Sequence, residues 1–284
     1  MRIAVTGGKG GTGKSTVAIN LAWELSKKFN VVLVDADVEC PNDHILLSKK
    51  LENPREEYIF RPKFNYKKCI RCSLCVKNCS ENAIVMFKEG YPFLMPTLCS
   101  GCKTCQLVCP SDAIEDDRKH IGNTYVTPVN ERLTLVTGML KEGEERSYPL
   151  VISTKKRANE LNYDIIIYDT SAGTGNHVAA AIENAQLAVV VTEPTPLGLH
   201  DLKMILRLLE KEGKKGYAVI NRYNIIDEMP ELNGIEVLEK IPLSERILES
   251  YVKGRPLSSI FPDSEESRIF SEMANKLVGL IWQK

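Results

Sequence analysis

The segment that most restricts the fold lies at the start of the chain, where an apolar strand pattern runs into a glycine-rich stretch. Residues 2–6 read RIAVT, and residues 8–16 read GKGGTGKST. From Gly8 the stretch matches G-x-x-x-x-G-K-[ST], a loop whose backbone N–H groups and following helix N-terminus point at phosphate oxygens. Residues 14–28 carry the helical apolar spacing that such a loop requires after it. The sequence therefore predicts a nucleotide-binding α/β domain.

Within this loop the lysine and the hydroxyl that close the motif have distinct expected roles. The Lys14 ammonium should reach the β- and γ-phosphates, and the Ser15 hydroxyl should ligate Mg²⁺. We expect ATP or ADP to be held by Gly8, Lys9, Gly10, Gly11, Thr12, Gly13, Lys14, Ser15 and Thr16.

Further apolar strands recur along the chain, and helical patterns separate most of them. They lie at residues 31–34, 165–168, 187–191 and 218–220. Continuous apolar strands alternating with helices are typical of a mostly parallel, doubly wound sheet that is covered on both faces. Residues 124–148 resemble a β-ribbon, with its turn predicted at residues 141–144.

Eight of the nine cysteines lie in a short region that interrupts this α/β pattern, and they form an internal repeat. The pattern C-x-x-C-x-x-C-x-x-x-C occurs twice, thirty residues apart, and this is the bacterial ferredoxin pattern for two [4Fe–4S] clusters. The fourth cysteine of such a run lies too far round to close its own cluster, so it ligates the other one. The expected ligand sets are Cys69, Cys72, Cys75 and Cys109 for one cluster, and Cys99, Cys102, Cys105 and Cys79 for the other.

Zinc is the alternative occupant, because paired C-x-x-C motifs also build zinc sites. The cysteine-rich region predicts an inserted small α+β ferredoxin-like domain at residues 61–118. The nucleotide-binding domain would then be discontinuous, over residues 1–60 and 119–284. Cys40, outside the repeat, is interpreted as a buried, inert thiol rather than a redox group.

The second lysine of the loop, Lys9, makes the segment resemble the deviant Walker A loop of the MinD/ParA ATPases, a group that includes the nitrogenase iron protein. The resemblance covers residues 1–60 and 120–284. It implies ATP hydrolysis and a homodimer that forms on ATP binding, in which Lys9 reaches the partner's phosphates. Residues 35–38, DADV, resemble the family's second motif, so that Asp37 would orient the attacking water. Lys9, Lys14 and Asp37 are therefore the expected catalytic residues.

Later segments resemble other motifs of the same family, in the same order. Residues 165–173, IIIYDTSAG, resemble its Walker B and switch II segment. The resemblance implies that Asp169 and Asp35 hold Mg²⁺ together with Ser15, and that Gly173 senses the γ-phosphate.

The base of the nucleotide has its own expected contacts. Asn221 and Arg222 resemble the family's adenine-recognising pair, with Asn221 reading the base edge. Ile241 and Pro242, followed by residues 251–256, resemble the motif that closes around the base. Asn221, Arg222 and Pro242 are thus expected to contact the nucleotide.

Composition excludes several other classes of protein. The formal net charge is zero and the pI is about 6.9, so no nucleic acid partner is expected. No apolar run approaches the roughly 20 residues that span a bilayer, and the chain opens without a signal-peptide pattern. A cytoplasmic location is expected. The apolar spacing of residues 268–282 predicts a helix that packs on the core rather than a membrane-binding tail.

Three functions remain open on these grounds. The first is an ATPase that couples dimerisation to electron transfer, with an unknown redox partner. The second is a maturation or carrier ATPase for which the clusters are cargo. The third is a spatial organiser like MinD or ParA, in which the clusters sense redox state.

Overall fold

The chain divides into two compact units in the computed structural model, which describes residues 1–88, 90–228, 232 and 234–282. The second unit contains all eight cysteines of the repeat. The first unit comprises Met1–Arg55, Asn123–Leu140 and Ser147–Lys284, and the second comprises Glu56–Gly122 and Lys141–Arg146.

A mostly parallel sheet forms the centre of the first unit. The pairs β1–β8, β1–β9, β9–β10, β10–β11, β2–β8 and β2–β7 are all parallel. This confirms the predicted α/β architecture. Over the described residues the sheet has the order β11 (Glu236–Ile241), β10 (Lys215–Asn221), β9 (Leu187–Thr192), β1 (Arg2–Thr6), β8 (Ile165–Asp169), β2 (Val31–Asp35), β7 (Leu133–Leu140), β6 (Ile114–Pro128), β3 (Arg55–Phe64).

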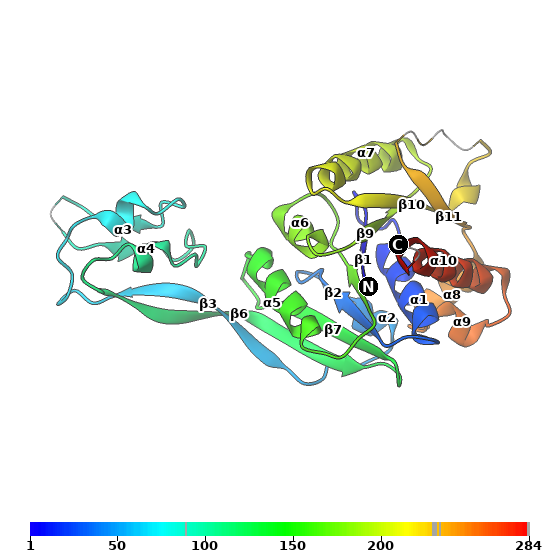
Figure 1. Cartoon of the computed structure of the whole chain (residues 1–284), viewed down its shortest axis with the longest axis horizontal. Helices are drawn as coiled ribbons and strands as arrows, with labels where there is room; N and C mark the ends of the chain where they lie inside the picture. Colours follow the sequence, from blue (N-terminus) through cyan, green and yellow to red (C-terminus); the bar gives the residue numbers. More distant parts are fainter. Residues whose placement is uncertain (89, 229–231, 233, 283–284) are drawn as a thin grey trace. The chain divides into compact units, whose positions relative to one another are not determined.

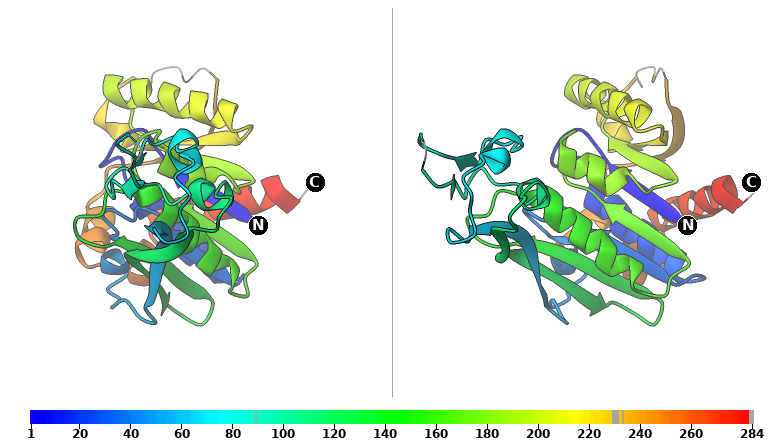
Figure 2. Two further views of the ribbon diagram at one scale, coloured as in Figure 1. Left: turned by 90° about the vertical axis from the view of Figure 1, so that its left-hand side faces the viewer. Right: turned by 60° about the vertical axis from the view of Figure 1, so that its left-hand side comes forward.

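Helices cover both faces of this sheet, as the continuous apolar strands require (Figures 1 and 2). Within the described residues, none of them combines the length and the apolarity that crossing a bilayer demands. The helices of the first unit are α1 (Lys14–Ser26), α2 (Asp43–Leu46), α5 (Ser147–Asn159), α6 (Asn176–Ile182), α7 (Pro196–Lys211), α8 (Glu245–Val252), α9 (Leu257–Ile260) and α10 (Glu265–Trp282), with a 3₁₀ turn at Tyr223–Ile225.

Alternate residues of the central strand enter two different cores. Ile3 and Val5 pack in a cluster with residues of α1 and α10, whereas Ala4 packs with residues of α7. Successive side chains of a strand point to opposite faces, so β1 is buried on both sides. Each fully buried leucine or isoleucine of these cores contributes about 1.5–3 kcal/mol. The loop after β1 therefore starts from a firmly held strand.

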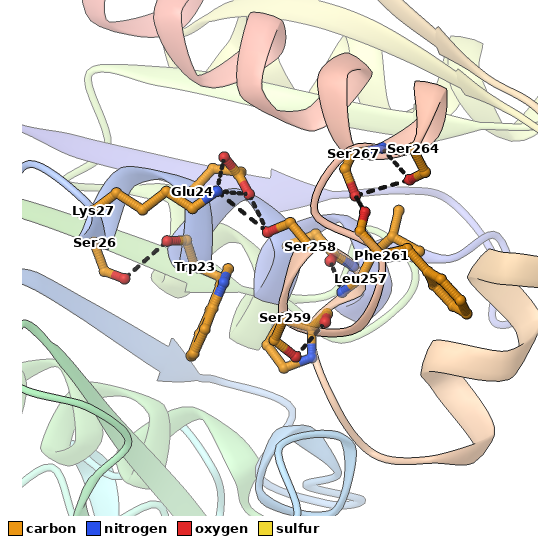
Figure 3. Close-up of polar contacts among 12 residues, drawn as sticks. Trp23, Glu24, Ser26, Lys27, Leu257, Ser258, Ser259, Phe261, Ser264 and Ser267 are labelled. Carbon is orange, nitrogen blue, oxygen red and sulfur yellow. Dashed lines mark hydrogen bonds and ion pairs between the residues drawn. The ribbon is translucent and has the colours of Figure 1, made fainter.

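A polar contact joins α1 to the segment around α9 (Figure 3). The Glu24 carboxylate is almost completely buried, and it accepts hydrogen bonds from Lys27 and from the Ser258 hydroxyl. One turn earlier, the Asn20 side-chain oxygen accepts a 2.7 Å bond from the Leu257 N–H. A buried carboxylate without such partners would be strongly destabilising.

The predicted β-ribbon has a different turn from the one expected. β6 and β7 are neighbours in the sheet, and residues 129–132 connect them, with the Val129 N–H donating to the Leu133 carbonyl oxygen. Residues 141–144 instead follow β7, and residues 147–148 already belong to α5. The prediction was wrong because the Asn130 side chain forms the turn, accepting bonds from the N–H groups of Arg132 and Leu133.

The second unit repeats its backbone geometry with the period of its sequence. Two short helices, α3 (Leu74–Lys77) and α4 (Thr104–Leu107), occupy equivalent positions, and β4 (Ile84–Val85) pairs antiparallel with β5 (Phe93–Leu94). Left-handed backbone conformations recur thirty residues apart, at Arg71 and Gly101, Ser73 and Lys103, and Asn82 and Asp112.

Candidate functional site

The glycine-rich loop lies between β1 and α1, and two of its glycines have positive φ. Gly11 has φ +79° and Gly13 has φ +93°, which residues with a side chain rarely adopt. At Gly13 there is also no room, because a Cβ atom would lie 2.3 Å from the Asn221 side-chain nitrogen. The loop can thus present its N–H groups and the start of α1 to an anion.

Lys14, the first residue of α1, is held under this loop. Its side chain is largely buried, and its Nζ donates a 3.0 Å hydrogen bond to the Lys9 carbonyl oxygen. Burial lowers the pKa of Lys14, while the negative charges of Asp169 and Asp37 act in the opposite direction. The ammonium is therefore largely removed from water, and two carboxylates favour its charged form.

Two buried carboxylates, Asp35 and Asp169, lie at the ends of β2 and β8. Asp35 accepts hydrogen bonds from the N–H groups of Asp37, Asn42 and Asp43, at 3.3, 3.0 and 3.1 Å. Burial raises the pKa of Asp35 well above its ordinary value. Both of its oxygens are thus used to shape the loop after β2.

Asp169, at the end of β8, has a different environment. Burial raises the pKa of Asp169 to about 6, although the side chains of Ser15 and Lys14 favour its charged form. One of its oxygens is buried and has no hydrogen-bond partner among the described residues. Asp43 lies beside Asp169, and burial raises the pKa of Asp43 well above its ordinary value. An unpartnered oxygen of this kind, next to Ser15, fits a bound cation.

A cavity of about 470 Å³ opens in front of the loop. Many of the predicted site residues line this cavity, although they come from distant parts of the sequence. They are Gly10, Gly11, Gly13, Lys14, Ser15, Thr16, Asp37, Asn221, Arg222 and Pro242. Gly8, Lys9, Thr12, Asp35, Asp169 and Gly173 are not among the lining residues.

Several lining residues were not predicted from the sequence. Asn42, Leu46, Thr170 and Ala172 come from segments next to predicted ones, and Leu243, Ser244, Ile247 and Leu248 come from the segment leading into α8 and from its first turns. The helical apolar spacing of residues 243–251 is the signal that could have indicated this wall.

Asn221 and Gly173 both bond to the glycine-rich loop. The Asn221 side-chain nitrogen donates a 2.8 Å bond to the Thr12 carbonyl oxygen, and its oxygen accepts from the Arg222 N–H. The Gly173 N–H donates to the Gly7 carbonyl oxygen at 3.3 Å. These bonds connect the end of β10 and the segment after β8 to the glycine-rich loop. The expected contacts of Asn221 and Gly173 with nucleotide remain predictions.

Lys9 and Arg222 share one carboxylate, which sequence reasoning missed. The Lys9 ammonium lies 3.3 Å from Glu193, and the Arg222 guanidinium pairs with the other oxygen of Glu193. The three residues follow β1, β10 and β9, which are neighbouring parallel strands. An acidic residue directly after the apolar strand 187–192 was the available signal.

In the second unit, each half of the cysteine repeat begins beside the end of the other half. The N–H groups of Asn65 and Met95, each four residues before a cysteine run, donate to the carbonyl oxygens of Ala113 and Ala83 at 2.8 and 2.7 Å. These alanines lie four residues after the last cysteine of the opposite run. The backbone thus brings the fourth cysteine of one run next to the first three of the other. One small cavity is lined, among other residues, by Cys69, Cys72, Cys75 and Cys109.

The sulfur atoms of the two fourth cysteines have equivalent environments. The Ala83 N–H donates to the Cys79 sulfur and the Ala113 N–H to the Cys109 sulfur, both at 3.3 Å. Burial raises the pKa of Cys105 to about 12. Cys40, in contrast, is exposed, so the prediction of a buried thiol at this position was wrong. Among the residues that the structure describes, no three His, Cys, Asp or Glu side chains converge closely enough to hold a single metal ion.

The glycine-rich loop, the acidic strand ends and the cavity define a P-loop nucleotide-binding protein with an α/β fold. Residues 3–257 match the CobQ/CobB/MinD/ParA nucleotide-binding domain family, and the chain belongs to this family.

Relatives extend over nearly the whole chain. The chain is 35% identical to the uncharacterised protein MJ0579 of Methanocaldococcus jannaschii. The alignment extends over 279 residues and covers 98% of each protein. It is 26% identical to a Pyrococcus abyssi protein named iron-sulfur cluster carrier protein, over 98% of this chain and 85% of the relative. The structure of the septum site-determining protein MinD with Mg-ADP from Pyrococcus horikoshii matches with a TM-score of 0.62 at 22% identity, over 98% and 96% of the two chains. At this identity the likeness concerns the fold.

Proposed function

We propose that this protein is an ATPase that dimerises around ATP and couples this step to electron transfer through two [4Fe–4S] clusters in its second unit. The observation that carries the proposal is that one chain contains both a P-loop cavity and two four-cysteine runs, with backbone hydrogen bonds that join the start of each half to the end of the other. Because both lie on one polypeptide, a nucleotide-driven movement of the first unit can alter how the second meets a partner.

In the nucleotide half, each residue has a role that follows from its position. Lys14 neutralises charge on the β- and γ-phosphates, and Asp37 orients the water that attacks the γ-phosphorus. The bond from this phosphorus to the bridging oxygen then breaks, giving ADP and phosphate. Asp37 lines the cavity and its pKa is raised by burial, which suits a group that must accept a proton during this attack.

Mg²⁺ fits the buried oxygens behind the loop. When bound, Mg²⁺ would supply positive charge that compensates the phosphate oxygens. The unpartnered oxygen of Asp169 and the Ser15 hydroxyl would hold it. Asp35 acts less directly, since both of its oxygens already accept backbone N–H bonds.

Lys9 supplies the coupling to dimerisation. It does not line its own cavity, and the glycines that follow it leave the loop exposed at that point. Its ammonium can therefore serve the phosphates of a second subunit, as the resemblance of its loop implies. Hydrolysis removes the charge that holds the two subunits together.

The cysteine sets suit [4Fe–4S] clusters. Backbone N–H bonds to the sulfur atoms of Cys79 and Cys109 stabilise thiolate ligands, and both sets combine cysteines from the two halves of the repeat. When bound, such clusters supply one-electron transfer at low potential.

A second candidate is delivery of clusters to other proteins. The observation that favours it is the name of the Pyrococcus abyssi relative, iron-sulfur cluster carrier protein. In that case the clusters would leave the chain instead of cycling between redox states.

One anaerobic experiment separates these functions. The purified protein should contain about eight irons per chain and should survive repeated reduction with dithionite and reoxidation without losing them. Transfer of the clusters to added apo-ferredoxin, with loss of iron from the chain, would favour the carrier function. Stoichiometric zinc without visible absorbance would refute both.

A further inference from the structure

The ion pair between Lys9 and Glu193 has no part in the proposed hydrolysis, yet it fixes the side chain on which dimerisation depends. Lys9 is about one-third exposed, whereas the Glu193 side chain is only 8% exposed. The carboxylate is thus the anchored partner, and the lysine is the group that can move.

Glu193 is anchored by its backbone as well as by its ion pairs. It follows the last residue of β9, a proline comes next, and Thr195 caps α7 by accepting a 3.0 Å bond from the Gly198 N–H. Thr192 donates a 2.9 Å bond to the Gly198 carbonyl oxygen. A residue fixed on both sides in this way keeps its carboxylate in one position relative to the ends of β1 and β10.

Lys9, in contrast, sits where the loop is open. A Cβ atom added at Gly10 or Gly11 would meet no atom within 4 Å. The lysine therefore has space to leave Glu193. The carboxylate would remain paired with Arg222, so that the departure does not strand a buried charge.

We propose that Glu193 is a positioning residue that holds Lys9 within its own subunit until the phosphates of a partner subunit compete for it. This inference rests on the proposed dimer. The γ-phosphate of ATP adds negative charge beyond the β-phosphate, so ATP in a partner subunit competes with Glu193 for Lys9, whereas ADP lacks this group. Glu193 thereby opposes dimerisation of subunits that lack ATP.

The test measures dimerisation of the full-length protein with the non-hydrolysable analogue AMPPNP, by sedimentation over a range of protein concentrations. Glu193→Gln removes the charge that retains Lys9. Losing one partly exposed ion pair of this kind corresponds to a change of about threefold. Two such pairs are broken per dimer, so Glu193→Gln should lower the dimer dissociation constant about tenfold. Glu210→Gln is the matched control, because it removes one acidic charge at an exposed position of α7. It should leave the dimer dissociation constant unchanged.

A double-mutant cycle with Lys9→Ala links the effect to the lysine. Lys9→Ala should weaken the dimer, and Glu193→Gln should then give no gain. An equal gain without Lys9, or no gain in the native background, overturns the role of Glu193. If Lys9→Ala leaves dimerisation unchanged, the proposed dimer itself is wrong.

A second variant covers the case in which Glu193→Gln does not fold. Glu193→Asp keeps the charge but shortens the side chain, which moves the carboxylate away from Lys9, and it should tighten the dimer by an intermediate factor. A melting temperature and an ADP affinity close to those of the native protein identify a folded variant. A folded Glu193→Asp variant with unchanged dimerisation overturns the inference.

Discussion

Lys14 and Asp37 both line the cavity, but they have opposite charges and act at different stages. The lysine is needed as soon as phosphate binds, because it compensates phosphate charge. The aspartate is needed only when water attacks, because it orients the nucleophile. Substituting each in turn therefore separates binding from hydrolysis.

Lys14→Ala should raise the dissociation constant for ADP about 10- to 100-fold, the usual range for losing hydrogen bonds to a charged group. Asp37→Ala should keep ATP bound while phosphate release stops. Fluorescent-nucleotide titration and a phosphate-release assay measure the two effects. Normal hydrolysis by Asp37→Ala would show that another residue orients the water.

Asp169 gives a prediction of pH dependence. Its pKa is raised to about 6 in the folded protein, above the ordinary 3.8, so the folded state binds more protons than the unfolded state between these values. Its contribution to the free energy of unfolding therefore falls as the pH rises from about 4 to about 6. Without Mg²⁺ and nucleotide, Asp169→Asn should gain up to about 3 kcal/mol relative to the native protein over this range. Urea unfolding at several pH values checks this, and a constant difference would contradict it.

At the scale of elements, the second unit consists of two similar halves whose ends interchange. The hydrogen bonds of Asn65 and Met95 connect each half to the end of the other. We therefore expect ligand sets that cross between the two runs.

Pairs of substitutions can test these crossed sets. Cys72→Ala with Cys109→Ala damages a single set and should leave about four irons per chain. Cys72→Ala with Cys79→Ala damages both sets and should leave fewer than four. Iron analysis and the spectrum of the reduced protein measure the outcome. If the two double variants exchange their results, each run instead forms a cluster from its own four cysteines.

At the scale of the whole molecule, the decisive question is whether Lys9 acts in its own site or in that of a partner. Lys9→Ala alone should lose hydrolysis and ATP-dependent dimerisation, with ADP affinity of the monomer nearly unchanged. When it is mixed with Asp37→Ala, one site of a mixed dimer receives an intact Lys9 from the partner and keeps its own Asp37. Phosphate release should then partly return. A Lys9→Ala monomer that hydrolyses ATP normally would exclude this mechanism.

The sequence alone determined the features whose chemistry requires fixed spacing. The glycine-rich phosphate loop could be predicted because its glycines and Lys14 all lie within one short segment of the sequence. The parallel sheet was predictable because strands buried on both faces are apolar throughout. The period of the cysteine repeat reappears in the backbone conformations of Arg71 and Gly101.

Only the tertiary structure decided which distant segments meet. Glu193 reaches Lys9 because β9 lies beside β1, and the strand order of a sheet is set by packing rather than by spacing along the chain. Asp43 is buried beside Asp169 for the same reason. The turn of the β-ribbon was misplaced because a glycine-containing turn at residues 141–144 and the asparagine turn at residues 129–132 have similar local propensities. The pairing of β6 with β7 selected between them.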